Sequence, residues 1–251
     1  MTAAGALGFQ APPGESLLAA ALRQGVALPY ECATGTCGTC RARLLDGEID
    51  AGWPAAPARQ ALKPDRREFL TCQAKARSDC TLQPLESCSP WPDGVERPAP
   101  CDSRVVQLQP LARDMLRLVV ETARPLAFQA GQFVLLQVPG VDGARAYSMA
   151  NPQSQADRLE FVVKRKPDGA VSRWLFETAA PGDAVRLFGP LGAAVFEPAL
   201  GHDLLLAVGG SGLAVALAVL GRADAAGYLG QHRARLFFGA PACATSAFWS
   251  S

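Results

Sequence analysis

The hydrophobic residues in the middle of the chain fall into short runs that favour β-strands. These runs cover residues 105–106, 115–120, 133–138 and 159–163, and Gly, Pro and Asp residues separate them. Several short β-rich runs with turn residues between them are typical of an antiparallel barrel or sandwich. We therefore expect antiparallel β-structure across this part of the chain.

A different pattern follows further along. Residues 204–221 form an 18-residue run without a charged side chain, which reaches the length of a membrane-spanning helix. A Gly-Gly-Ser-Gly sequence at residues 209–212 interrupts it, so a buried strand, a glycine turn and a helix explain the run better than a membrane span does. A further apolar run at residues 236–238 completes a β-α-β unit.

The first part of the chain predicts one short helix. Residues 17–22 are all Leu and Ala, Ser16 or Glu15 precedes them as a cap, and Gly25 ends them. We expect this to be a packing helix without chemistry. Residues 7–11 leave room for a single strand before it.

Composition and charge exclude several classes of function. The 251 residues are 49% hydrophobic and 19% charged, and the net charge of +1 argues against a nucleic-acid surface. Only two histidines are present, which leaves little material for His-centred chemistry. The eight cysteines come without a visible signal peptide in residues 1–11, so they indicate a metal cluster in a reducing cytoplasm rather than disulfides.

Four of these cysteines have the spacing of an iron–sulfur ligand set. Cys32, Cys37 and Cys40 are separated by four and two residues, and Cys72 follows after 31 more. This is the plant-type arrangement for a 2Fe–2S cluster. Two glycines and several small residues between the first three cysteines let the loop wrap around a cluster with its N–H groups near the sulfur atoms.

Two alternatives to the cluster remain open. A zinc site usually pairs two Cys-x-x-Cys-like knuckles, whereas here the fourth ligand stands alone. Purely structural thiols are the other alternative. The remaining cysteines fit no ligand spacing and are interpreted as ordinary thiols: Cys80, Cys88, Cys101 and Cys243.

Residues suited to a nucleotide cofactor lie in the β-rich part. Arg145 can pair a pyrophosphate, Tyr147 can stack on an aromatic ring system, and Ser148 can bond a ring nitrogen or carbonyl. Gly169 and Ser172 lie in a glycine turn that opens a helix, where free N–H groups attract anions. Taken singly, these segments also fit a plain strand with an exposed arginine and an ordinary helix cap.

The glycine turn of the β-α-β unit is a third candidate. Gly209, Gly210, Ser211 and Gly212 lie between a buried strand and a helix, where glycines let a phosphate or ring approach the backbone. The sequence is not a clean Gly-x-Gly-x-x-Gly, so it supports a nucleotide site without specifying one.

Together these segments resemble the reductase components of bacterial multicomponent, ring-hydroxylating oxygenases. In that family a plant-type ferredoxin precedes a ferredoxin–NADP reductase-like module, and the resemblance spans residues 9–239 with every motif in the family's order. It implies that the four spaced cysteines hold the cluster. Arg145, Tyr147 and Ser148 match the family's Arg-x-Tyr-Ser flavin motif, which meets the pyrophosphate and ring of FAD.

The resemblance extends to the two glycine turns. It implies that Gly169 and Ser172 seat the FAD phosphates. It also implies that residues 209–212 match the Gly-Gly-Thr-Gly turn for the nicotinamide nucleotide, with Ser211 keeping the hydroxyl of the threonine.

The implied fold is an α+β multidomain protein. We expect a β-grasp ferredoxin domain at residues 1–88, a linker at 89–100, a six-stranded antiparallel FAD barrel at 101–200 and a partial α/β nucleotide-binding domain at 201–251. The linker range contains four prolines.

The implied activity is that of an NAD(P)H-dependent oxidoreductase. Electrons would pass from NAD(P)H through FAD to the 2Fe–2S cluster and on to a partner oxygenase or ferredoxin, with no catalytic side chain assigned because the cofactors carry the chemistry. We expect a cytoplasmic monomer that binds neither nucleic acid nor membrane. The residues leave NADH and NADPH equally open.

The chain departs from the family pattern towards its end. Val215 stands where the family usually has proline, and residues 241–251 stand where further β-α units are usual. We expect a truncation or a shifted reading frame there, with slow reduction of the flavin by NAD(P)H. An electron-transfer module with impaired NAD(P)H oxidation and a reductase for a deoxysugar dehydratase are the alternative functions.

Overall fold

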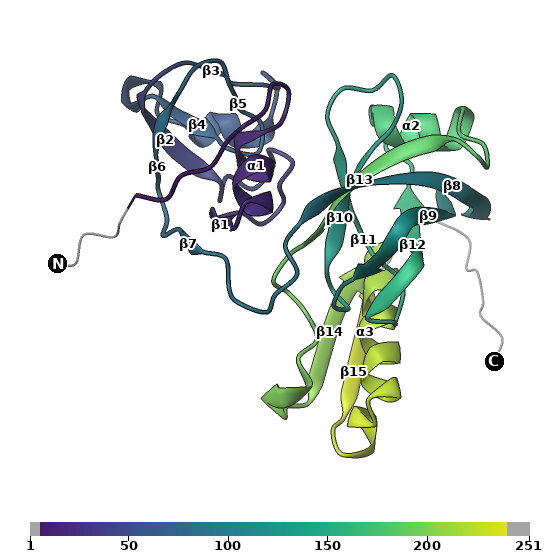
Figure 1. Ribbon diagram of the computed structural model, residues 1–251. Helices are drawn as coiled ribbons and strands as arrows, with labels where there is room; N and C mark the ends of the chain where they lie inside the picture. Colours follow the sequence, from purple (N-terminus) through teal and green to yellow (C-terminus); the bar gives the residue numbers. More distant parts are fainter. Residues whose placement is uncertain (1–5, 240–251) are drawn as a thin grey trace.

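The computed structural model describes residues 6–239. Three parts follow one another along the chain, and Figure 1 shows the first beside a central barrel and the last below that barrel. The expectations for residues 241–251, including Cys243, lie outside the described residues.

The first part packs one helix on a small sheet, as expected of a β-grasp domain. Helix α1 (Leu17–Arg23) begins where the Ser16 hydroxyl accepts a hydrogen bond from the Ala19 N–H over 3.2 Å, and it buries Leu17, Leu18 and Leu22. The helix thus has the predicted place and the predicted serine cap. The strands form a three-stranded sheet in the order β4-β2-β6 and two short pairs, β3-β5 and β1-β7. Their bounds are Val26–Ala27 (β1), Arg41–Asp46 (β2), Ile49–Asp50 (β3), Glu68–Leu70 (β4), Lys75–Ala76 (β5), Thr81–Pro84 (β6) and Ser89–Pro90 (β7), and two 3₁₀ turns cover Pro57–Ala61 (η1) and Pro64–Arg66 (η2).

The strand expected at residues 7–11 is wrong, because residues 6–12 form no strand. The backbone N–H and carbonyl of Gln10 both bond the side-chain amide of Gln24, which follows α1. A side chain therefore satisfies the polar backbone groups that a strand partner would otherwise satisfy.

The central part is the predicted six-stranded antiparallel barrel, in the order β11-β10-β13-β8-β9-β12. Its core contains fully buried side chains from alternate strand positions, such as Leu118, Val120, Leu159 and Phe161. The Ala150 N–H, just after β11, donates to the Glu160 carbonyl of β12 over 2.7 Å and helps to close the barrel. The elements are Ala99–Ala112 (β8), Met115–Ala127 (β9), Phe133–Gln137 (β10), Arg145–Ser148 (β11), Gln155–Lys164 (β12), Ala170–Glu177 (α2) and Ala184–Leu191 (β13).

The last described part is the predicted strand, glycine turn, helix and strand. Strand β14 (Leu204–Gly209) leads into helix α3 (Gly212–Ala225), and β15 (Ala234–Gly239) pairs in parallel with β14. Short 3₁₀ turns cover Pro198–Leu200 (η3) and Tyr228–Gly230 (η4). The apolar run that reached membrane-spanning length is thus divided, and within residues 6–239 we find no helix long and apolar enough to cross a membrane.

The first part packs directly on the barrel. Leu191 of β13 is buried in the same apolar cluster as Leu22, Leu28 and Leu70 of the first part. Phe133 and Leu135 of β10 and Phe188 of β13 pack against this cluster from the barrel side. The two parts therefore share one core at their boundary.

Candidate functional site

The cysteine loop curls around the sulfur atom of Cys32. The backbone N–H groups of Thr34, Thr36 and Cys37 all donate to this sulfur over 3.4 Å. Gly35 makes the curl possible, because its φ of +83° lies in the left-handed region where side chains are disfavoured. The loop thus presents several N–H groups to one sulfur, as the small residues predict.

These donors change the acidity of the Cys32 thiol. Burial alone would raise its pKa, but the N–H groups of Thr34, Cys37 and Thr36 outweigh this and lower the pKa to about 7. A lowered pKa favours the thiolate, which is the form that binds metals.

The other two cysteines of the set form a second, buried pair. The sulfur atoms of Cys40 and Cys72 lie 3.3 Å apart, although 31 residues separate them in the chain. The hydrogen bond between the two side chains lowers the pKa of Cys40 to about 7 against the effect of burial, and the same bond together with burial raises the pKa of Cys72. The contact therefore favours ionisation of Cys40 over ionisation of Cys72.

The donor set fits a two-iron cluster better than a single ion. Cys32 and Cys37 lie together at the surface side, whereas Cys40 and Cys72 lie buried. Two pairs of sulfur atoms suit the four thiolates and two irons of a 2Fe–2S group.

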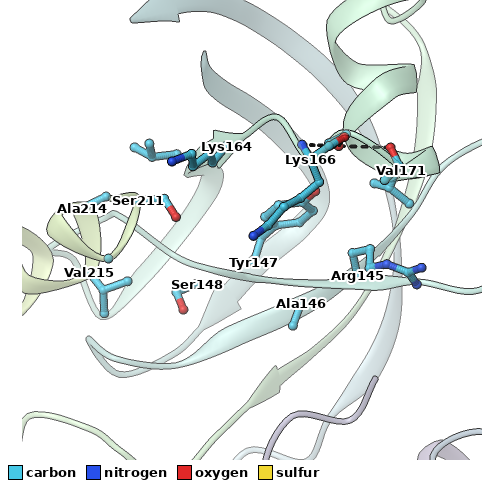
Figure 2. A pocket seen from close by; sticks show the side chains of 14 residues that line it. Arg145, Ala146, Tyr147, Ser148, Lys164, Lys166, Val171, Ser211, Ala214 and Val215 are labelled. Atoms are coloured by element: carbon cyan, nitrogen blue, oxygen red, sulfur yellow. Dashed lines mark hydrogen bonds between the residues drawn. The ribbon is translucent and has the colours of Figure 1, made fainter. Parts of the chain in front are cut away.

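A pocket of about 320 Å³ lies where the barrel meets the last part of the chain. Figure 2 shows its lining: side chains from strand β11 lie opposite the start of helix α3, and the turn before α2 closes the remaining side. The three segments singled out in the sequence therefore border one cavity. The predicted residues among its lining are Arg145, Tyr147, Ser148, Gly169, Ser172, Ser211 and Gly212.

Strand β11 fixes the direction of its side chains through its pairing with β10, in which Leu136 faces Arg145 and Val134 faces Tyr147. The Tyr147 ring meets Phe161 edge-on, with ring centres 6.5 Å apart. Burial raises the pKa of Tyr147 to about 12, so its hydroxyl stays protonated at neutral pH. The residue offers a neutral, largely buried ring at the wall of the pocket.

The turn before α2 is held by one hydroxyl. Ser172 accepts a hydrogen bond from the Lys166 N–H over 3.1 Å and donates to the Gly169 carbonyl over 3.0 Å. Gly169 leaves no room for a side chain, because a Cβ there would lie 2.6 Å from the Ser172 oxygen and 2.8 Å from the Lys166 Cβ. The turn is therefore compact, and the first N–H groups of α2 lie beside the pocket.

The glycine turn after β14 reaches the pocket only with its second half. Ser211 and Gly212 line it, as does Val215, whereas Gly209 and Gly210 do not. Gly209 instead ends β14 beside Gly239, and Gly210 makes the turn with a φ of +53°.

Sequence reasoning missed the basic residues of the pocket. Lys164 and Lys166 line it together with Val162. Val162 and Lys164 lie at the end of β12, and Lys166 follows two residues after that strand. The spacing of two places Val162 and Lys164 on one face of the strand, so this part of the signal was present in the sequence. The two ammonium groups make the pocket suited to an anionic ligand.

Comparisons with known proteins agree with both halves of this arrangement. Residues 5–77 match the family described as 2Fe-2S iron-sulfur cluster binding domain, and residues 103–196 match the oxidoreductase FAD-binding domain. The ferredoxin–NAD(+) reductase component of the alkene monooxygenase system of Xanthobacter autotrophicus is 37% identical over 227 residues, which cover 88% of this chain and 67% of that protein. The chain belongs to the family of reductase components of bacterial multicomponent oxygenases.

Two further relatives support this membership. The phenol 2-monooxygenase reductase component of a Pseudomonas species is 39% identical over 80% of this chain and 56% of that protein. The solved structure of the ferredoxin reductase in carbazole 1,9a-dioxygenase superposes with a TM-score of 0.83 at 34% identity, covering 94% of this chain and 70% of the other. The chain spans 67% and 56% of the lengths of the alkene and phenol monooxygenase components.

The family membership settles the cofactor classes. The iron–sulfur domain of this family binds a 2Fe–2S cluster, its FAD-binding domain binds FAD, and its electron donor is NAD(P)H. The residues described above suit both groups, since the iron–sulfur domain brings the four spaced cysteines together as two pairs and a basic pocket with a neutral tyrosine suits a flavin nucleotide. The relatives named here serve oxygenases, so neither the deoxysugar dehydratase alternative nor the module without NAD(P)H oxidation gains support.

Proposed function

We propose that this chain carries electrons from NAD(P)H to the oxygenase component of a multicomponent oxygenase, either directly or through a separate ferredoxin. The observation that carries the proposal is that strand β11, the turn before α2 and the turn after β14 border one pocket, in a chain whose first domain holds two pairs of cysteines. Bound together, FAD and the 2Fe–2S cluster convert the electron pair of a nicotinamide into single electrons.

The cysteines take the role of cluster ligands in this proposal. Cys32, Cys37, Cys40 and Cys72 would hold the two irons through their four thiolates. The N–H groups around Cys32 stabilise negative charge on its sulfur, which favours the reduced cluster and tunes its potential.

The barrel side of the pocket would bind the flavin. Arg145 would pair the pyrophosphate, the first N–H groups of α2 after Gly169 would bind its oxygens, and Tyr147 would pack on the isoalloxazine ring. Ser148 donates to the ring, and Ser172 keeps the turn in shape through its two hydrogen bonds.

The start of α3 would bind the nicotinamide nucleotide. Ser211 and Gly212 border the pocket from that side, and Gly209 and Gly210 allow the backbone to turn beneath the ligand. Tyr147 and Ser211 thus line one cavity, in which a flavin ring and a nicotinamide would have to meet in direct contact for hydride transfer.

The remaining expectations are part of the same proposal. We place the ferredoxin domain at residues 1–88, the linker at 89–100, the flavin domain at 101–200 and the nucleotide domain from 201. We also propose a monomer in the cytoplasm that binds neither nucleic acid nor membrane. The free thiols among the described cysteines support a reducing compartment, and a net charge of +1 is low for a protein that binds nucleic acid.

An anaerobic titration watched by visible absorption tests the proposal. Protein reconstituted with iron, sulfide and FAD receives NADH, then NADPH in a parallel sample, and finally dithionite. We expect bleaching of flavin absorption followed by loss of the cluster bands. Protein that contains zinc in place of iron, or that binds no FAD, would overturn the proposal, and bleaching by dithionite alone would restrict it to the electron-transfer module.

A further inference from the structure

The flavin-motif arginine has a partner on the iron–sulfur domain. The guanidinium carbon of Arg145 lies 5.5 Å from the centre of the Trp53 ring, within the range of a cation–π contact. Trp53 belongs to the loop between β3 and η1, and 39% of its surface remains exposed. Trp53 lies in the region that matches the iron–sulfur family, and Arg145 lies in the region that matches the FAD-binding family. The contact between them therefore joins two separate domains.

The loop that carries Trp53 is anchored to the cysteine loop. Ala58 donates its N–H to the Gly35 carbonyl over 3.1 Å. Gly52 packs so closely on the backbone beside Cys72 that a Cβ would lie 2.3 Å from the Gln73 carbonyl oxygen. A single short segment therefore touches the cysteine loop at one end and the flavin-motif arginine at the other.

The geometry of a guanidinium lets both contacts exist at once. An aromatic ring meets the face of the planar group, whereas phosphate oxygens bind the N–H groups along its edge. One N–H group of the Arg145 side chain donates a hydrogen bond to the neighbouring Ala144 carbonyl over 2.9 Å. The four other N–H groups of the side chain remain for anionic oxygens.

We propose that Trp53 is a positioning residue for FAD binding, which orients Arg145 towards the pyrophosphate from the iron–sulfur domain. The inference rests on the proposed role of Arg145 in holding FAD. It makes the FAD site a shared site of two domains, so that flavin binding strengthens the docking of the iron–sulfur domain and docking strengthens flavin binding by the same factor.

A double-mutant cycle on FAD affinity tests this. FAD is titrated into cluster-containing protein freed of flavin, and the dissociation constant is read from the quenching of flavin fluorescence. We expect Trp53→Ala to weaken FAD binding about two- to fivefold, the range of an exposed cation–π contact, and Trp53→Phe to restore part of it. Leu45→Ala is the control, since it removes an exposed apolar side chain of the same domain that lies outside the core at the domain boundary.

The cycle separates positioning from a general structural effect. If Trp53 acts through Arg145, the double variant Trp53→Ala, Arg145→Ala binds FAD as weakly as Arg145→Ala alone. Additive losses, or an unchanged affinity in Trp53→Ala while Arg145→Ala is weakened, overturn the inference and leave the FAD site intact. An unchanged affinity in Arg145→Ala overturns the proposed FAD site itself.

The coupling between FAD binding and domain docking supplies a second measurement that does not depend on activity. Addition of FAD is expected to slow hydrogen exchange in residues 51–58 of the unaltered protein and to leave it unchanged in Arg145→Ala. Equal exchange with and without FAD in the unaltered protein would contradict the coupling.

Discussion

The hydroxyl of Tyr30 accepts a hydrogen bond from the backbone N–H of Gly192 over 3.1 Å, and this contact joins the iron–sulfur domain to the flavin barrel. Tyr30 lies two residues before Cys32, and Gly192 directly follows β13. Burial raises the pKa of Tyr30, with the Gly192 N–H opposing the shift, so the hydroxyl stays protonated at neutral pH. The start of the cysteine loop is therefore fixed against the barrel.

Replacement of Tyr30 by phenylalanine tests this restraint. The ring stays in the shared core, but the Gly192 N–H loses its acceptor, so the balance between docked and undocked domains is expected to shift about two- to tenfold. Hydrogen exchange at Gly192 is the measurement and should accelerate, while the visible spectrum of the cluster stays the same. Tyr228→Phe is the control, because its hydroxyl bonds His202 in the last part of the chain. Unchanged exchange at Gly192 would show that other contacts hold the domains together.

Loss of one buried sulfur is expected to remove the cluster. In Cys72→Ser the pair with Cys40 loses a thiolate ligand, and iron content should fall from about two per chain towards zero, with loss of the visible bands. Cys88→Ser is the control, since Cys88 is an exposed free thiol outside the ligand spacing. Equal iron in the two variants would show that Cys72 is no ligand.

The glycines of the cysteine loop separate two physical effects. Gly35 and Gly38 have nearly equal φ values of +83° and +85°, so alanine at either position meets backbone strain of about 1–2 kcal/mol. A Cβ at Gly35 would also lie only 3.1 Å from the Ala56 Cβ, whereas at Gly38 the nearest atom is 3.5 Å away. We expect Gly35→Ala to lose its cluster faster than Gly38→Ala on incubation with a chelator, followed by visible absorption. Equal rates of cluster loss would mean that Ala56 can move away from the added methyl group without weakening the cluster site.

The sequence predicts local features well where spacing or period alone decides them. The cysteine intervals predict the iron–sulfur domain, and the glycine turn at residues 209–212 predicts that an apolar run divides into strand and helix. Contacts between distant residues leave no such pattern. Tyr30 and Gly192 are 162 positions apart, and neither residue type specifies the other as its partner. The wrong strand at residues 7–11 has the same origin, because the Gln24 side chain that bonds Gln10 carries no strand signal.

The pocket, too, combines short motifs that are visible in the sequence with contacts between distant residues that are not. The motif of β11 and the turn before α2 are each visible as short sequences, yet each also fits a plain strand or an ordinary cap. Only the closing of the barrel brings them to one cavity with Ser211. The position of Trp53 over Arg145 depends in addition on how two domains pack, which the apolar cluster at their boundary decides.

The last prediction concerns the turn that we propose holds the FAD phosphates. Gly169 has no left-handed backbone, so Gly169→Ala adds only a methyl group, which would lie 2.8 Å from the Lys166 Cβ and 2.6 Å from the Ser172 hydroxyl. The hydroxyl can rotate away, but it then gives up its bonds to the Lys166 N–H and the Gly169 carbonyl, and the Lys166 Cβ must move with the backbone. Loss of one such hydrogen bond corresponds to about two- to tenfold weaker FAD binding.

Ser172→Ala, which removes the hydroxyl without adding bulk, should weaken FAD binding to a similar degree, and Gly8→Ala, where a methyl group meets open space, should not weaken it. Fluorescence titration of the three variants distinguishes the causes. If Gly169→Ala alone binds FAD weakly, bulk at the turn rather than the serine hydroxyl shapes the phosphate site, and if all three bind FAD like the unaltered protein, the phosphates lie elsewhere in the pocket.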